Sequence, residues 1–200
     1  MPPPVPAVST EPVTHPSPRI PPLTAPPADV AELLAGTWLY NGEPLNVPRT
    51  MAHHPRLLRR FASFAGLFLL KSELPVRDRE FLTLRATYRT GAEYYFGHHV
   101  LMAEAAGIPP EVLREITSPH GSFDDADALL VAVADELIDD GVLSDATWGA
   151  LRERYTESQA MELLLLPGFY RMVAGFVNTL GVEREPGVPG WPADLSTGVQ

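Results

Sequence analysis

The sequence predicts an all-α protein. Apolar residues recur at three- and four-residue spacing through most of the chain, while period-two alternation and Asn-Gly hairpin turns at strand ends are not recognised. Residues 29–182 are therefore predicted to form a single helical domain. A chain of 200 residues, of which 45% are hydrophobic, is long enough to bury such a core.

Start and stop signals place the helices in chain order. Pro44 and Pro48 predict a loop over residues 37–50, and Gly91 breaks or bends the chain between two central helices. Capping residues are predicted at Ser122 with Asp125, at Ser144, and at Thr156 with Gln159. Helices are expected over residues 29–35, 54–70, 76–90, 92–106, 110–116, 122–141, 144–155 and 156–180.

The last of these helices is apolar on most of its surface. Pro167 is expected to kink or interrupt it. A single small bundle is not expected to cover so much apolar surface, which predicts burial against another subunit. Its apolar residues include Leu163, Leu164, Leu165, Leu166, Phe169, Met172, Val173, Phe176 and Val177.

Both ends of the chain are predicted to be irregular. Eleven of the 22 prolines lie in residues 2–27, so residues 1–28 are read as a flexible or surface-draped arm. Residues 183–200 are rich in Pro and Gly and form an irregular tail, in which Trp191 is the side chain that could anchor the segment.

Composition excludes several classes of function. The chain has no cysteine, which removes disulfides, thiolate metal sites and thiol chemistry. A formal charge of −10 disfavours nucleic acid and anionic membranes as partners. No apolar run reaches the roughly 20 residues of a membrane helix, and no secretory signal is seen, so a cytoplasmic protein is expected.

Glu80 and His99 are the candidate catalytic pair. If the chain reverses near Gly91, the two residues lie at similar heights on neighbouring helices and could face one another. A carboxyl and an imidazole in a pocket form a sensible acid–base pair. Tyr95 shares a helical face with His99 and could donate to a carbonyl or an oxyanion. Glu80 as a first-turn acid and His99 as a core residue remain structural alternatives.

Other polar residues are weaker candidates. Arg85 and Arg89, four residues apart, could bind a carboxylate, although an intersubunit salt bridge or solvent exposure fits equally well. His98 and His99 diverge by about 100°, which disfavours a metal pair. No metal site and no cofactor are predicted.

The stretch LPVRDREFLTLRATYRTGAEYYFGHHVLMAEAAGIPPEVL resembles the core of the carboxymuconolactone decarboxylase family, which includes the alkylhydroperoxidase-D-like proteins. The looser similarity covers about two-thirds of the chain. This resemblance implies a helical bundle whose central hairpin builds the active site, with subunits that associate as trimers, hexamers or dimers. The matching elements are Arg77, Arg79, Glu80, Glu93, Tyr94, Phe96, Gly97, His98 and His99.

The peroxidase branch of that family carries a Glu, then C-x-x-C-x-x-x-H. Its Glu and His correspond to Glu80 and His99, whereas Ala92 and Tyr95 occupy the two cysteine positions. Thiol peroxidase activity is therefore not expected. The decarboxylase branch needs no cysteine and implies proton transfer on a small carboxylated ring compound.

The working hypothesis is a cofactor-free acid–base enzyme acting on a small molecule, with secondary metabolites among the candidates. Glu80 and His99 would move a proton, Tyr95 and His98 would polarise the substrate, and Phe96 and Arg85 would help to bind it. Decarboxylation, isomerisation, dehydration or lactone chemistry would all fit. Two alternatives are a non-catalytic binding or assembly module in which Tyr95 and Phe96 plug the pocket, and a metal enzyme that uses Glu80, His99 and a residue of another chain.

Overall fold

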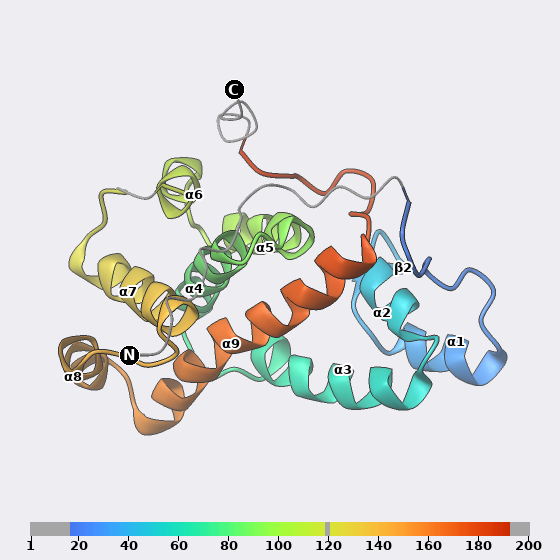
Figure 1. The fold of residues 1–200 in the computed structure, drawn as a ribbon, viewed down its shortest axis with the longest axis horizontal. Coiled ribbons are helices and arrows are strands. Elements are labelled where there is room, and N and C mark those ends of the chain that lie inside the picture. Colours follow the sequence, from blue (N-terminus) through green and yellow to red (C-terminus); the bar gives the residue numbers. More distant parts are fainter. Residues whose placement is uncertain (1–16, 119–120, 193–200) are drawn as a thin grey trace. The chain divides into compact units, whose positions relative to one another are not determined.

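The computed structural model describes residues 17–118 and 121–192, and this part of the chain confirms the all-α prediction (Figure 1). Nine helices and one short hairpin are present among these residues. The elements are α1 (Ala28–Ala35), β1 (Leu39–Tyr40), β2 (Glu43–Pro44), α2 (Asn46–Met51), α3 (Pro55–Leu70), α4 (Val76–Arg89), α5 (Glu93–Ala105), α6 (Pro110–Ile116), α7 (Asp125–Asp139), α8 (Asp145–Arg154) and α9 (Glu157–Leu180). The start of the predicted arm and residues 193–200 of the predicted tail lie outside the described residues.

The chain divides into two compact units. Unit 1 holds Glu73–Gly175 and residues 189–192 of the tail, whereas unit 2 holds residues 17–72 and Phe176–Val188. Helix α9 begins in unit 1 and ends in unit 2. The sequence, which predicts one domain over 29–182, gives no signal of this division.

A β-hairpin in unit 2 replaces part of the predicted loop over residues 37–50. Strands β1 and β2 pair antiparallel around Asn41 and Gly42, whose φ values of 52° and 84° are both positive. Asn-Gly is the pair that adopts such a turn most readily. The reading that no Asn-Gly hairpin occurs was therefore wrong, because strands of two residues are too short to show alternation.

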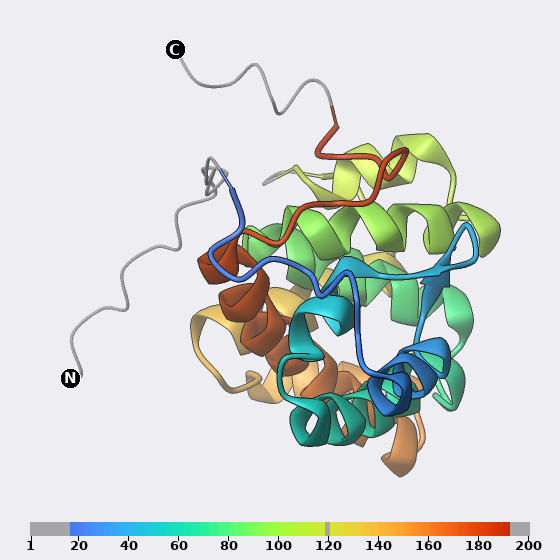
Figure 2. The ribbon, with the colours of Figure 1, turned by 90° about the vertical axis from the view of Figure 1, so that its right-hand side faces the viewer.

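The rest of that predicted loop forms helix α2. Pro48 lies in its first turn, where a backbone N–H has no intrahelical partner, so the proline does not break the helix. Helices α1, α2 and α3 pack together in unit 2, and β2 lies against α1 (Figure 2).

The described part of the arm is held on the surface of unit 2. The backbone N–H of Arg19 donates to the carbonyl of Leu180 at 2.8 Å, and that of Leu23 donates to the carbonyl of Arg49 at 3.1 Å. Residues 19 and 23 therefore tie this segment to unit 2.

Helix α3 only partly buries its predicted apolar stripe. Leu58, Ala65 and Phe68 are buried, whereas Leu57 and Phe64 are 46% and 44% exposed. The predicted stripe spans about half of the helix circumference, and the elements packed on α3 cover only part of it.

Helix α4 is the centre of unit 1, with α5 and α7 packed along it (Figure 1). Its residues 81–87 are all buried. Gly91 has a φ of 65° and reverses the chain between α4 and α5, as predicted. The hairpin places residues distant in sequence face to face.

The capping predictions are mostly confirmed. Ser144 accepts from the N–H of Thr147, and Thr156 and Gln159 exchange hydrogen bonds as a capping box does. Asp124, and not Ser122, caps α7, because its carboxylate accepts from the amides of residues 126 and 127.

Helix α9 is continuous through Pro167 and is covered by its own chain more fully than predicted. It is long and apolar enough to cross a membrane by length and composition, but half of its apolar window is buried inside the protein, as in a core helix. Leu163, Leu166, Phe169, Val173 and Val177 are buried. The exposed large apolar residues of α9 are Met161, Leu165 and Met172.

Candidate active site

Glu80 and His99 meet inside unit 1. Glu80 comes from α4 and His99 from α5, and Oε2 of the carboxylate lies 2.6 Å from Nδ1 of the imidazole. Their side chains are 0% and 4% exposed. The hairpin therefore creates the predicted contact, while the catalytic role of the pair stays a prediction.

Arg79 binds the other oxygen of the same carboxylate. Its Nε and Nη2 donate to Oε1 of Glu80 at 2.9 and 2.8 Å. Burial alone raises the pKa of Glu80, but His99 and Arg79 outweigh burial and hold the pKa below its ordinary value. The carboxyl is therefore ionised at neutral pH and accepts hydrogen bonds on both oxygens.

Tyr170 of α9 completes the cluster. Its hydroxyl lies 2.8 Å from Nε2 of His99, and the two rings meet edge to face at 5.1 Å. Burial raises the pKa of Tyr170 well above its ordinary value, and the charge of Glu80 adds to this effect. The phenol therefore keeps its proton at neutral pH.

The ionisation of Glu80 determines one hydrogen bond on His99. An ionised carboxylate can only accept, so Nδ1 of His99 donates to it. The neutral hydroxyl of Tyr170 can donate to Nε2 or accept from it. Glu80 therefore orients the imidazole, and Tyr170 holds its second nitrogen.

Tyr95 adjoins this cluster through Tyr170. The two rings pack edge to face with centroids 5.7 Å apart, and the Tyr95 hydroxyl is buried. Ala92, one turn earlier on the same face, is fully buried. The two positions that correspond to the cysteines of the peroxidase branch are therefore both buried, one filled by a methyl group and the other by a phenol that packs on Tyr170.

His98 and Phe96, both predicted to bind substrate, have other neighbours. The ring of His98 packs on Tyr94 at 5.0 Å, and that of Phe96 packs on Trp191 at 4.7 Å. Trp191 also donates its backbone N–H to Glu93 at 3.0 Å, so it anchors the tail as the sequence suggests. The roles of His98 and Phe96 in substrate binding stay predictions.

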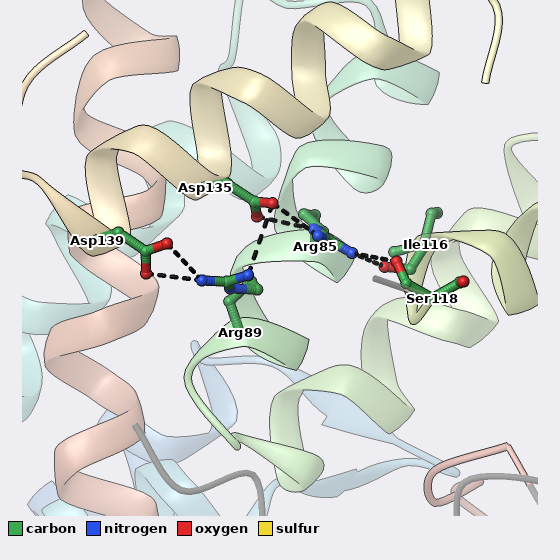
Figure 3. A network of polar contacts seen from close by, with 6 residues as sticks. All are labelled: Arg85, Arg89, Ile116, Ser118, Asp135 and Asp139. Atoms are coloured by element: carbon green, nitrogen blue, oxygen red, sulfur yellow. Dashed lines mark hydrogen bonds and ion pairs between the residues drawn. The ribbon is translucent and has the colours of Figure 1, made fainter. Parts of the chain in front are cut away.

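Arg85 contacts groups of its own chain, and its role in substrate binding stays a prediction (Figure 3). Its Nε and Nη2 bind the carboxylate of Asp135 at 2.8 and 2.6 Å, and its Nη1 donates to the carbonyls of Ile116 and Ser118. Nearly half a helical turn separates Arg85 from Glu80 around α4. The arginine instead joins α4 to α7 and to the end of α6.

The cluster is closed in this conformation. Glu80, His99 and Tyr170 are 0%, 3% and 1% exposed, and both nitrogens of His99 are hydrogen-bonded within the chain. A ligand therefore reaches Nε2 only after Tyr170 moves. Among residues 17–118 and 121–192, no group of three His, Asp or Glu side chains is placed to hold a metal ion.

Sequence reasoning missed Tyr170. It lies in α9, whose apolar pattern indicates only a core helix, and 71 positions separate it from His99. A polar hydroxyl in so apolar a run was the one available signal, because a buried tyrosine usually finds a hydrogen-bond partner.

The fold belongs to the class of the alkylhydroperoxidase core. One similar structure is the "alkylhydroperoxidase AhpD core: uncharacterized peroxidase-related protein" from Ralstonia eutropha JMP134, with a TM-score of 0.73 and 21% identity over 86% of this chain and 95% of that one. An uncharacterized peroxidase-related protein from Silicibacter sp. TM1040 gives a TM-score of 0.71 and 14% identity over 94% and 96%.

Within that class, residues 55–136 match the sequence model of the carboxymuconolactone decarboxylase family, which confirms the resemblance noted on the sequence. The matched segment contains Glu80 and His99 and excludes Tyr170. None of the curated proteins matches the chain.

Proposed function

We propose that the protein is a cofactor-free acid–base enzyme of the carboxymuconolactone decarboxylase family that acts on a small molecule. The observation that carries the proposal is the 2.6 Å contact between Glu80 and His99, which holds an imidazole against a buried carboxylate. His99 moves the proton. Glu80 orients the imidazole of His99 and stabilises its charged form, and Tyr95 lines the site. Thiol peroxidase activity is not part of the proposal, because the chain has no cysteine.

Tyr170 supports this function as well. Its phenol meets Nε2 at 2.8 Å, in the position where a group that gives or takes a proton must lie. Proton transfer assisted by a positioned side chain contributes about 10²–10⁴-fold in rate. The reactions that fit are isomerisation, dehydration, lactone opening and decarboxylation.

Turnover on a panel of small lactones, enols and hydroxy compounds tests the proposal. Glu80→Gln and His99→Ala should each lower kcat by about 10²-fold or more on any compound that the wild type converts. Glu104→Gln, an exposed Glu→Gln change on α5, is the matched control and should leave kcat unchanged. Full activity in either site variant, with folding verified by thermal unfolding, would remove that residue from the mechanism.

A non-catalytic module is the second candidate, favoured by the closure of the site. Glu80 and His99 are almost fully buried and satisfy each other, as structural partners would. In that case no compound of the panel is converted, and Glu80→Gln and His99→Ala change only the stability of the protein.

A further inference from the structure

The geometry points to a neutral proton donor as the ligand of this site: an uncharged molecule whose phenol-like or enol-like O–H, or activated C–H, replaces the hydroxyl of Tyr170 on Nε2 of His99. This inference rests on the proposed function and narrows its substrate class. It excludes ligands that bind through a carboxylate group of their own, and it therefore excludes decarboxylation as the reaction.

The first support is the hydrogen-bonding state of His99. The inference takes His99 as the neutral ring, with its Nδ1 proton donated to the ionised Glu80 and its Nε2 as an acceptor. The group that occupies Nε2 in this conformation, the phenol of Tyr170, is an uncharged hydroxyl that can donate to it. A carboxylate has no proton at neutral pH and would set lone pair against lone pair at this nitrogen.

The second support is that no arginine of α4 is left for a ligand carboxylate. Four arginines lie on this helix, and each already holds a carboxylate of its own chain. The shortest contacts of the four pairs are 2.6 Å for Arg77 with Asp127, 2.8 Å for Arg79 with Glu80, 2.6 Å for Arg85 with Asp135 and 2.6 Å for Arg89 with Asp139.

The net negative charge of unit 1 also disfavours an anionic ligand. Residues 73–175 contain 18 acidic and eight basic side chains. A ligand anion brought next to Glu80 would therefore meet an ionised carboxylate in a buried, low-dielectric site, which is costly. A neutral ligand avoids this cost.

The chain also has a means to admit such a ligand. Pro167 has no N–H for the carbonyl four residues earlier in α9, and Gly168 follows it, so the helix is weakest one turn before Tyr170. Movement there would withdraw the phenol from Nε2. The apparent affinity for a ligand is then reduced by the small fraction of open molecules.

The chemical step on a neutral ligand balances without a further reactant. Nε2 of His99 forms an N–H bond as the O–H or C–H bond of the ligand breaks, and the electron pair stays on the ligand as an enolate or phenolate. The imidazolium is neutralised by Glu80. Return of the proton to another carbon gives an isomer, and its delivery to a departing hydroxyl gives water and an alkene.

Binding of two compounds that differ in charge tests the inference. Methyl 4-hydroxybenzoate and 4-hydroxybenzoate have the same ring and phenol, and only the second carries a carboxylate. Calorimetric titration of the full chain should give at least tenfold tighter binding of the ester. The ester should also shift the Nε2 resonance of His99 in ¹⁵N spectra, and His99→Ala should lose this preference.

Tyr170→Phe adds a second readout, because it removes the hydroxyl that competes for Nε2. It should tighten binding of the ester by about fivefold, the equivalent of one ordinary hydrogen bond. Tyr40→Phe, in the hairpin of unit 2, is the matched control and should bind the ester as the wild type does.

Equal or tighter binding of 4-hydroxybenzoate, or binding of neither compound, would overturn the inference. These results are independent of catalysis: a preference for the ester without turnover of any compound supports the inference and counts against the proposed function. Conversely, turnover of a carboxylated substrate that needs Glu80 and His99 supports the function and overturns the inference.

Discussion

The hydroxyl of Tyr170 lies 2.8 Å from Nε2 of His99, and this hydrogen bond joins α9 to the α4–α5 hairpin. The same contact closes the site, because the side chains on both sides of it are almost fully buried. Stability and access are therefore coupled at this hydrogen bond.

Tyr170→Phe should lower the free energy of unfolding by about 1–3 kcal/mol at pH 7, because Nε2 of His99 is left buried without this hydrogen-bond partner. Burial raises the pKa of Tyr170, so in the wild type this phenol stabilises the fold below pH 10 and the contribution is lost as the pH rises further. Urea unfolding between pH 7 and 11 should show a shallower alkaline decline in the variant. Equal declines would contradict the buried, neutral phenol.

Glu80→Gln should flatten the acid limb of stability. The folded pKa of Glu80 lies below its ordinary value of 4.5, so the folded state binds fewer protons than the unfolded state between the two values. Its contribution is complete above pH 4.5 and disappears as the pH falls through the folded pKa. Thermal unfolding from pH 7 to 3 measures this, with Glu104→Gln as the control that should retain the wild-type slope.

Arg85 and Arg89 offer a matched pair of variants in one polar network. The side chain of Arg85 is 4% exposed. Its removal leaves the carbonyls of Ile116 and Ser118 without this donor and leaves Asp135 with the 3.7 Å ion pair to Arg89, so Arg85→Ala should cost about 3 kcal/mol. Arg89 is 29% exposed and bonds to the exposed Asp139, so Arg89→Ala should cost less than about 1 kcal/mol. Chemical denaturation compares the two, and similar losses would show that burial does not decide their contributions.

Trp191 should hold the tail on the α4–α5 hairpin by its ring and its backbone. Its indole packs edge to face on Tyr88 at 5.7 Å, while its buried Nε1 makes no hydrogen bond to residues 17–118 or 121–192. Trp191→Ala should cost about 2 kcal/mol, but Trp191→Phe less than about 1 kcal/mol, since an aromatic face remains and no hydrogen bond is lost. Proteolysis of the tail, followed by mass spectrometry, should accelerate only in Trp191→Ala.

Association into a homo-oligomer stays a prediction, and α9 provides a place to check it. Met161, Leu165 and Met172 are 58%, 54% and 57% exposed and recur at spacings of four and seven residues, so they form one row on the helix. If a second copy covers this row, Leu165→Glu should lower the mass measured by light scattering. Leu70→Glu, an exposed leucine on α3, serves as the comparison, and an unchanged mass in Leu165→Glu would exclude this face.

The periodicity of apolar residues identified almost every long helix, because amphipathic spacing is local information. It also placed Glu80 and His99 on opposite arms of a hairpin, since Gly91 marks the reversal and the rise per residue sets their heights. The same reasoning missed the β1–β2 hairpin, because strands of two residues are too short to show an alternating pattern. It also predicted that Pro48 breaks regular structure, whereas a proline in the first turn does not interrupt a helix.

The ion-pair partners of charged side chains could not be predicted from the periodicity of the sequence. Arg85 and Asp135 are 50 positions apart, and the spacing of Arg85 with Arg89 fits a substrate site as well as an interhelical pair. Only the packing of α4 on α7 decides between the two. Exposure follows the same rule, because a wide apolar stripe on α3 does not tell which of its residues find neighbours.

The sequence by itself determined the helical class, the reversal at Gly91, the absence of cysteine and the pairing of a carboxyl with an imidazole. These follow from spacing, composition and the fixed geometry of a helix. The tertiary structure alone decided that Tyr170 occupies the free nitrogen of His99 and that every arginine of α4 is already bound. Both depend on contacts between side chains that are distant in the sequence, and no local sequence pattern predicts such contacts.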